Sequence, residues 1–318
     1  MITEQAHVPK GAGQGEDRLV VISDEHGIRC AGIVDGATDK SGRAYAGQSG
    51  GAVAAECVAE TLRHLSPGTD PAAAVTAITN GLARLRRRWG IADDDPLAPS
   101  AVAAVLLPRQ RLIWRVGDVH VAISRPGRRE HHRGDKRIDR VLAEARAAYL
   151  HCLLAEGHQA ADLAREDPGR ALVLPVLQRQ SLLANRFEAG PLGFGVLDGR
   201  RVPDRFIEVF PLGEDALEVT MASDGYLSAA ERLAQAEQEL AASLRVDPLR
   251  IGAHPSTKGL APGATSFDDR TYLRLRRSAD DAAAPSRGGC RPPSDHHRRE
   301  DAHEAVDCGG GEAASGSA

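Results

Sequence analysis

Acidic residues stand at the ends of several apolar, strand-like segments of this 318-residue sequence. Asp35 follows AGIV, Asp118 follows LIWRVG and Asp224 follows VTMAS. Acids also precede two further apolar segments: Glu16, Asp17, Asp268 and Asp269. Each pattern alone is ordinary turn chemistry, because Asp and Gly readily form the turn that ends a strand. Their joint occurrence in one chain predicts a cluster of carboxylates at one edge of a β structure.

Carboxylates that converge from several strand ends repel one another, and cations make such crowding tolerable. Hard oxygen ligands without His or Cys favour Mg²⁺ or Mn²⁺ over zinc. Two such ions can share a carboxylate and a bridging water, lower the pKa of that water and hold phosphoryl oxygens during in-line attack. The residues therefore predict hydrolysis of a phosphate ester without a covalent enzyme intermediate.

The segments that position these acids follow recognisable patterns. Residues 19–23 and 27–34 are two β-branched runs around a short polar turn, which predicts a hairpin. Apolar positions recur at helical spacing over residues 47–65. A second helix is expected to begin at Pro71, after Asp70.

Turn residues divide residues 101–124 into three apolar runs, which predicts a three-stranded meander with Asp118 at its second turn. The basic stretch 125–140 is expected to be a loop that leads into a helix over 141–163. It is either a flap that receives an acidic phosphopeptide or a solvated loop. Two strands at 218–222 and 271–275 and a helix that Ser228 caps complete the expected order.

Composition limits the classes of function. A net charge of −4 offers no global basic field for nucleic acid or an anionic membrane. The sequence shows neither an apolar stretch of bilayer length nor a signal peptide at its start, so we expect a cytoplasmic protein. Five isolated cysteines lack the close pairs of zinc or redox motifs, and Cys30 and Cys57 are expected to pack as small apolar residues in a reducing compartment.

Five short motifs occur in the order GED, IVDGATD, VGD, MASDGY and SFDDRT. In this order they resemble the metal-dependent protein phosphatase 2C family in its bacterial form, over about residues 10–277. The resemblance implies an α+β fold, a four-layer αββα sandwich of two antiparallel sheets flanked by helices. It also implies two Mg²⁺ or Mn²⁺ ions, with a third at Asp118, and a phosphoserine or phosphothreonine protein as substrate.

The resemblance further implies roles for individual residues. Asp35 would bridge both ions, and the carbonyl of Gly36 would bind one of them. Asp224 and Asp268 would hold the other ion, so that Asp35, Asp224 and Asp268 form the catalytic set. The remaining two acids would orient water on the metals: Glu16 and Asp17.

Three positions differ from the usual family pattern. Ala37 stands where the family has a His that is a candidate general acid. The phosphate-binding Arg upstream of the acidic pair is missing, and Lys10 is its candidate substitute, although a solvated lysine is the alternative. Asp269 stands where Asn is usual, which adds negative charge.

The sequence thus predicts a catalytic domain over residues 1–277 and a disordered polar tail over 278–318. Two alternatives to a protein phosphatase stay open on the same scaffold: a pseudophosphatase that binds or regulates without turnover, and a phosphatase of small molecules.

Overall fold

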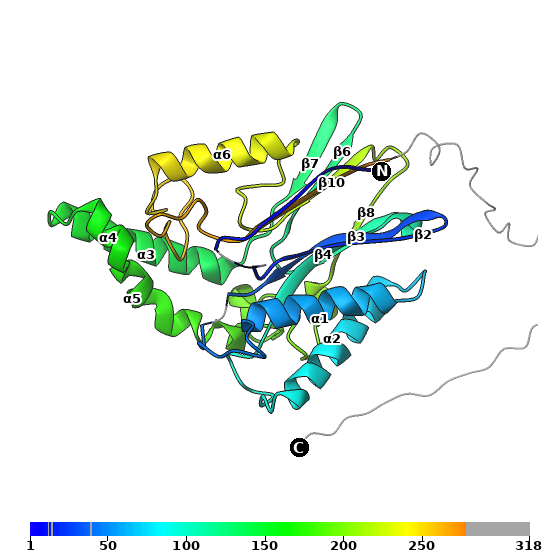
Figure 1. Ribbon diagram of the computed structural model, residues 1–318, viewed down its shortest axis with the longest axis horizontal. Helices are drawn as coiled ribbons and strands as arrows, with labels where there is room; N and C mark the ends of the chain where they lie inside the picture. The colour runs from blue at the N-terminus through cyan, green and yellow to red at the C-terminus, as the bar shows by residue number, and fades with distance from the viewer. Residues whose placement is uncertain (12, 14, 39, 278–318) are drawn as a thin grey trace, which may run out of the picture. The chain divides into compact units, whose positions relative to one another are not determined.

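Two five-stranded antiparallel sheets form the centre of the structure, a computed structural model that describes residues 1–11, 13, 15–38 and 40–277 (Figure 1). The predicted tail over 278–318 lies outside the described residues. In spatial order the first sheet contains β1 (Ile2–Val8), β10 (Arg270–Arg276), β9 (Glu218–Ala222), β6 (His120–Arg125) and β7 (Arg128–His132). The second contains β2 (Arg18–Asp24), β3 (Gly27–Gly36), β4 (Ala101–Leu107), β5 (Leu112–Val116) and β8 (Glu208–Pro211).

Helices cover the outer face of each sheet (Figure 1). Helices α1 (Gly50–His64) and α2 (Pro71–Arg88) share a hydrophobic core with the second sheet, and α6 (Leu233–Val246) shares one with the first. The predicted four-layer αββα sandwich is therefore confirmed. In the described part of the chain, every helix is too short or too polar to span a membrane.

Strands β3 and β4 are apolar on both faces because each face meets a different core. Cys30 and Val34 point to the core with α1 and α2, whereas Ala31 and Ile33 point to the core between the sheets. This alternation follows from the two-residue period of a strand. Cys30 packs as the apolar residue that the sequence predicts, and burial raises the pKa of its thiol to about 12.

The first hairpin and the first two helices agree with the prediction. Strands β2 and β3 pair from Arg18 opposite Val34 to Asp24 opposite Gly27. Helix α2 begins at Pro71, and the side chain of Asp70 accepts a hydrogen bond from the amide of Ala73 at 2.9 Å. A short polar cap and a proline in the first turn specify this helix start locally.

The predicted three-stranded meander is wrong. Strands β4 and β5 pair, but β6 lies in the other sheet between β9 and β7. The chain therefore crosses from one sheet to the other at Gly117 and Asp118. Gly117 has φ +96°, and a Cβ there would lie 2.2 Å from Cγ1 of Val102, so this crossing requires a glycine.

Four further features differ from the expected ones. Part of the basic stretch forms strand β7, which pairs with β6. The helix expected over 141–163 is α3 (Arg137–Ala155), followed by the short α4 (Ala160–Glu166) and by α5 (Pro168–Leu177). Helix α6 begins five residues after Ser228, and its N-cap is Arg232 without a side-chain hydrogen bond. Strand β1, which the sequence did not indicate, adds an edge to β10.

Candidate functional site

The predicted acids all lie at one end of the two sheets. Antiparallel pairing places the start of β2, at Arg18, beside Val34 near the end of β3. It likewise places Ala222 at the end of β9 between the starts of β10 and β6. The acids flank these strand ends: Glu16, Asp17, Asp35, Asp118, Asp224 and Asp268. The cluster therefore draws on both sheets and on the crossing between them.

Glycines allow the acidic segments to approach one another through their backbones. A Cβ on Gly225 would lie 1.9 Å from the carbonyl oxygen of Asp269, and one on Gly134 would lie 1.6 Å from that of Asp118. A Cβ on Gly36 would meet the carbonyl oxygens of Gly51 at 2.4 Å and Glu16 at 2.6 Å. Gly36 thus joins the end of β3 to the first turn of α1 and to the acidic pair.

Replacing Gly36 by Ala should destabilise the protein by roughly 1–3 kcal/mol, the usual cost of overpacking a core. The atoms that a Cβ would meet belong to the backbone and cannot rotate away. Thermal or denaturant unfolding measures the loss. Gly11→Ala is the matched control, because nothing lies within 4 Å of a Cβ at Gly11. Equal stability of the two variants would contradict this packing role.

Three carboxyl groups of the cluster have raised pKa values. Burial and the charges of Asp269 and Asp268 raise the pKa of Asp17 to about 7, against hydrogen bonds that include one from Thr271 Oγ1 at 2.8 Å. Burial and neighbouring carboxylates raise the pKa of Asp35 well above its usual value, with Asp17 and Asp224 as the largest charges. Loss of surrounding water and the charges of Asp268 and Asp118 raise the pKa of Asp224 to about 7, although its side chain is still accessible to solvent. Ionisation of all three groups would therefore place uncompensated negative charge in the cluster.

Lysines compensate part of that charge at Glu16 and Asp268. Nζ of Lys10 lies 3.1 Å from Oε2 of Glu16, 3.1 Å from Oδ1 of Asp268 and 3.2 Å from Oγ1 of Thr38. Nζ of Lys258 lies 2.5 Å from the other oxygen of Asp268. Burial would raise the pKa of Asp268, but Lys258 and Lys10 outweigh that effect and lower it. Lys10, predicted to grip phosphate, is thus placed inside the cluster.

Asp118 has a lysine of its own. Nζ of Lys136 lies 2.9 Å from Oδ2 of Asp118, and both side chains are largely buried. Burial would lower the pKa of Lys136, but Asp118 and Asp139 outweigh it and raise the value. The connection before α3 is thereby tied to the point where the chain crosses between the sheets.

Asp269 holds the loop of the acidic pair. Its carboxylate accepts hydrogen bonds from the amide of Lys10 at 2.7 Å and from the amide of Glu16 at 2.5 Å, and the residue is 3% exposed. Ser49, the N-cap of α1, donates to Oε1 of Glu16 at 2.7 Å. The residue that departs from the family pattern therefore positions Glu16.

The donor chemistry of the cluster fits a hard divalent cation. Among the described residues, the carboxylates of Asp35 and Asp224 form no hydrogen bond or ion pair, and both are crowded by other acids. Oxygen donors with excess negative charge are the ligands that Mg²⁺ and Mn²⁺ prefer. However, within the part of the chain that the structure describes, no three His, Cys, Asp or Glu side chains are grouped closely enough to hold a metal ion.

The sequence analysis did not identify Lys136 and Lys258 as residues of the site. The small number of lysines in the composition is a signal that could have identified them. Of the 40 lysine and arginine residues in the chain only four are lysines, at positions 10, 40, 136 and 258. Three pair with acids of the cluster, and Lys40 lies near Lys136, Arg170 and Lys258. The rarest basic residue is thus gathered at one site.

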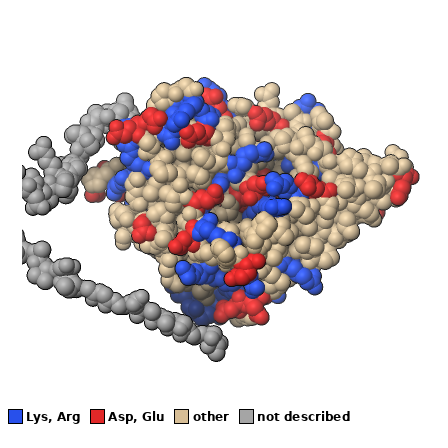
Figure 2. Space-filling model, turned by 180° about the vertical axis from the view of Figure 1, so that it is seen from behind, with Lys and Arg blue, Asp and Glu red and all other residues tan. Residues whose placement is uncertain are grey.

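A cleft of about 500 Å³ opens beside the cluster. Its lining consists of glycine and alanine residues together with Lys10, Glu16, Thr38, Arg43, Gln48, Ser49 and Asp269. On the face shown in Figure 2, acidic and basic side chains alternate rather than separate into fields of one sign. The cleft offers room for a substrate side chain next to Glu16.

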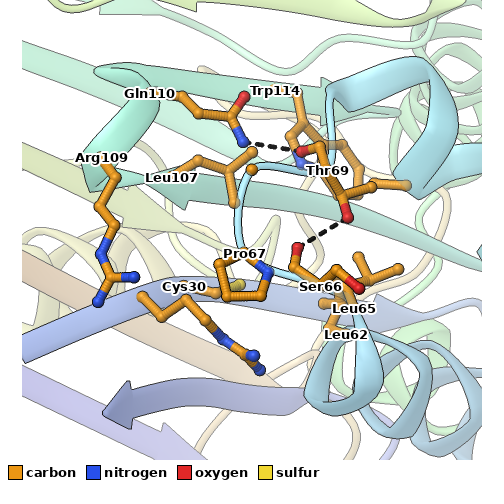
Figure 3. Close-up of a pocket in the computed structure, with 13 residues that line it drawn as sticks. Cys30, Leu62, Leu65, Ser66, Pro67, Thr69, Leu107, Arg109, Gln110 and Trp114 are labelled. Carbon is orange, nitrogen blue, oxygen red and sulfur yellow. Dashed lines mark hydrogen bonds between the residues drawn. The ribbon is translucent and has the colours of Figure 1, made fainter. Parts of the chain in front are cut away.

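A second pocket lies between the α1–α2 loop and the second sheet (Figure 3). Its walls include Cys30, Leu62 and Trp114, and the amide of Gln110 donates to the carbonyl of Thr69 at 2.8 Å. The enclosed volume is about 30 Å³, close to that of one water molecule. With no acid among its lining residues, this pocket provides no chemistry comparable to the cluster.

Two arginines of the basic stretch over 125–140 make internal contacts. Nη2 of Arg129 donates to Thr220 Oγ1 at 3.0 Å and to the carbonyls of Ala229 and Ala230 at 2.9 and 3.0 Å. Arg125 pairs with Asp215 at 2.8 Å. These two arginines fix the β6–β7 hairpin to neighbouring segments. Lys136, in the same stretch, contacts Asp118 of the cluster.

Comparisons with known proteins find matches by structure but not by sequence. No protein-family model and no curated protein matches the sequence. Similar solved structures include serine/threonine phosphatases from two bacteria and a bacterial PP2C domain.

Three of these structures illustrate the similarity. The Mycobacterium tuberculosis serine/threonine phosphatase PstP/Ppp is 16% identical, with a TM-score of 0.44 over 86% of this chain and 98% of its own. Staphylococcus aureus Stp1 is 14% identical, with a TM-score of 0.44 over 87% and 96%. The SiaA-PP2C domain of Pseudomonas aeruginosa is 13% identical, with a TM-score of 0.44 over 86% and 85%. The catalytic domain of PstP has also been solved in complex with two manganese ions.

Proposed function

We propose that this protein hydrolyses phosphoserine and phosphothreonine monoesters in other proteins, with Mg²⁺ or Mn²⁺ bound at the carboxylate cluster. One observation carries the proposal. Asp35 and Asp224, from different sheets, lie in one cluster of acids without any hydrogen bond or ion pair among the described residues. Unpaired, crowded carboxylates of this kind are the ligands of a hard cation.

The residues of the cluster have different proposed roles. Asp35, the Gly36 carbonyl and Asp224 are the proposed metal ligands, and Asp268, Asp118, Glu16 and Asp17 surround them. Bound divalent ions would activate water for attack on the phosphorus and neutralise the phosphoryl oxygens. Asp269 and Ser49 keep Glu16 in place through the contacts described above. Ala37 carries no ionisable group, so this position provides no imidazole to protonate the leaving alkoxide.

The substrate class rests on the motif order and on the open cleft beside Glu16. A cleft of about 500 Å³ accommodates a phosphorylated side chain with part of its backbone. Lys10 and Thr38 line this cleft with an ammonium and a hydroxyl group. These groups support a phosphoprotein substrate.

A pseudophosphatase is the second candidate, and a specific observation favours it. Lysines occupy both oxygens of Asp268, and Ala37 replaces the usual candidate acid. Such a protein would bind a phosphorylated partner in the same cleft without turnover.

One assay separates the candidates. Release of phosphate from phosphoserine and phosphothreonine peptides and from p-nitrophenyl phosphate is measured with Mn²⁺, with Mg²⁺ and with EDTA. The proposal expects metal-dependent hydrolysis with a higher kcat/KM for the peptides. Hydrolysis in EDTA, or none by a folded protein that binds the peptides, contradicts it. A preference for small esters identifies a small-molecule phosphatase instead.

A further inference from the structure

The lysines of the cluster already occupy oxygens that a second metal ion would need. Oε2 of Glu16 faces Lys10 and Oε1 accepts from Ser49. Oδ1 of Asp268 faces Lys10 and Oδ2 faces Lys258. Both oxygens of both carboxylates are therefore engaged, whereas those of Asp35 and Asp224 are free of hydrogen bonds and ion pairs among the described residues.

The contacts of Lys10 resemble those of a small cation more than those of a surface lysine. Its ammonium group lies within 3.2 Å of three oxygens from three separate segments: Glu16, Thr38 and Asp268. An ammonium is a compact point charge with three rotatable donors, whereas a guanidinium is a planar fork that needs more room. This difference explains why a chain rich in arginine has lysine at these positions.

We propose that the centre holds one divalent cation, on Asp35 and Asp224, and that Lys10 and Lys258 provide the positive charge of a second ion at Glu16 and Asp268. Lys136 does the same at Asp118, the residue expected to bind a third. The proposal rests on the proposed function, because it specifies the occupancy of the same site. It differs from the two or three ions that the sequence predicts.

The division of the cluster between one metal ion and the lysines has a physical basis. A divalent ion on Asp268 would lie next to two ammonium groups, and like charges at such separations repel strongly in a partly buried site. Removing the lysines removes that repulsion and frees both oxygens of Asp268. Loss of lysine should therefore create a second metal position, whereas loss of an ordinary buried lysine would only lower stability.

The test counts metal ions directly. Full-length, metal-depleted protein is dialysed against Mn²⁺, the bound metal is measured, and ions retained by Asp35→Asn/Asp224→Asn are subtracted as binding elsewhere. We expect one ion in the wild type and two in Lys10→Met/Lys258→Met. The electron paramagnetic resonance spectrum should be that of an isolated Mn²⁺ in the wild type and show exchange coupling in the double variant. Circular dichroism checks the fold of each variant. If the double variant does not fold, the single variant Lys258→Met takes its place.

Lys40→Met is the matched control. Lys40 belongs to the same lysine group, but its Nζ donates to the carbonyl of Thr38 at 3.1 Å and, within the described part of the chain, contacts no acid of the cluster. It should leave the count at one. Two coupled ions in the wild type, or no gain in the lysine variants, overturns the inference.

The outcomes also separate this inference from the function on which it rests. One bound ion without hydrolysis contradicts the proposed function and supports the single-ion centre. Two bound ions with hydrolysis support the proposed function and contradict the single-ion centre. The absence of any bound ion in every variant removes both.

Discussion

Asp35→Asn should reduce phosphate ester hydrolysis at least about 100-fold, because groups that only orient a metal ligand already contribute about 10- to 100-fold. Asp35 is the next-to-last residue of β3, and four other carboxylates act on its charge: Asp17, Asp224, Asp118 and Asp268. An amide has nearly the same shape but donates little charge to a cation. The loss should therefore appear in kcat and in Mn²⁺ affinity together. Initial rates across a Mn²⁺ titration measure both.

The exposed Asp94 provides the control for this change. It lies in the connection between α2 and β4, and Asp94→Asn removes the same charge outside the cluster. Its rate should equal that of the wild type. An Asp35→Asn protein that keeps the wild-type rate at saturating Mn²⁺ would show that the cluster is not the catalytic centre.

Asp17→Asn should stabilise the metal-free protein, and the gain should grow as the pH rises from about 4 to about 7. The pKa of Asp17 is raised from 3.8 to about 7 by burial and by neighbouring acids. Between these values the folded protein holds a proton that the unfolded chain has lost, so stability falls with rising pH. Asn is uncharged at every pH and still accepts the hydrogen bond from Thr271. At roughly 1.4 kcal/mol per pH unit, the gain reaches a few kcal/mol.

The comparison with the wild type isolates this group from others that titrate in the same range. Burial lowers the pKa of His120 to about 4, and that shift makes stability rise with pH up to about 6.5. Both proteins contain His120, so its effect cancels in the difference. Chemical unfolding at several pH values in EDTA gives the two stability curves. A constant offset between pH 4 and 7 would mean that Asp17 ionises normally in the folded protein.

The lysines explain how this chain tolerates so many acids before any metal binds. Lys10, Lys136 and Lys258 reach the cluster from three loops, and each contacts a carboxylate within 3.1 Å. Among the described residues, none of the other three acids, Asp35, Asp17 and Asp224, forms an ion pair with a lysine, and they keep raised pKa values. The contrast between the two groups is the basis both of the pH prediction and of the inferred single-ion centre.

The sequence alone determined the features that depend on neighbours in the chain. The β2–β3 hairpin follows from two alternating runs around a polar turn, and α2 follows from Asp70 and Pro71. The order of the acidic motifs identified the resembling family and hence the four-layer sandwich. Each of these depends on local backbone preference or on a short pattern, which a reader of the sequence can see.

Only the tertiary structure decided which segments meet. Asp118 lies at a crossing between sheets rather than in a meander, because β6 finds its partners in β7 and β9, far along the chain. Strand β1 exists because β10 offers it an edge, and α6 begins at Leu233, which packs against the core of the first sheet, not at the capping residue Ser228. Lys258 reaches Asp268 only through the loop after α6. Contacts between distant segments are set by packing and charge in three dimensions, and no local pattern encodes them.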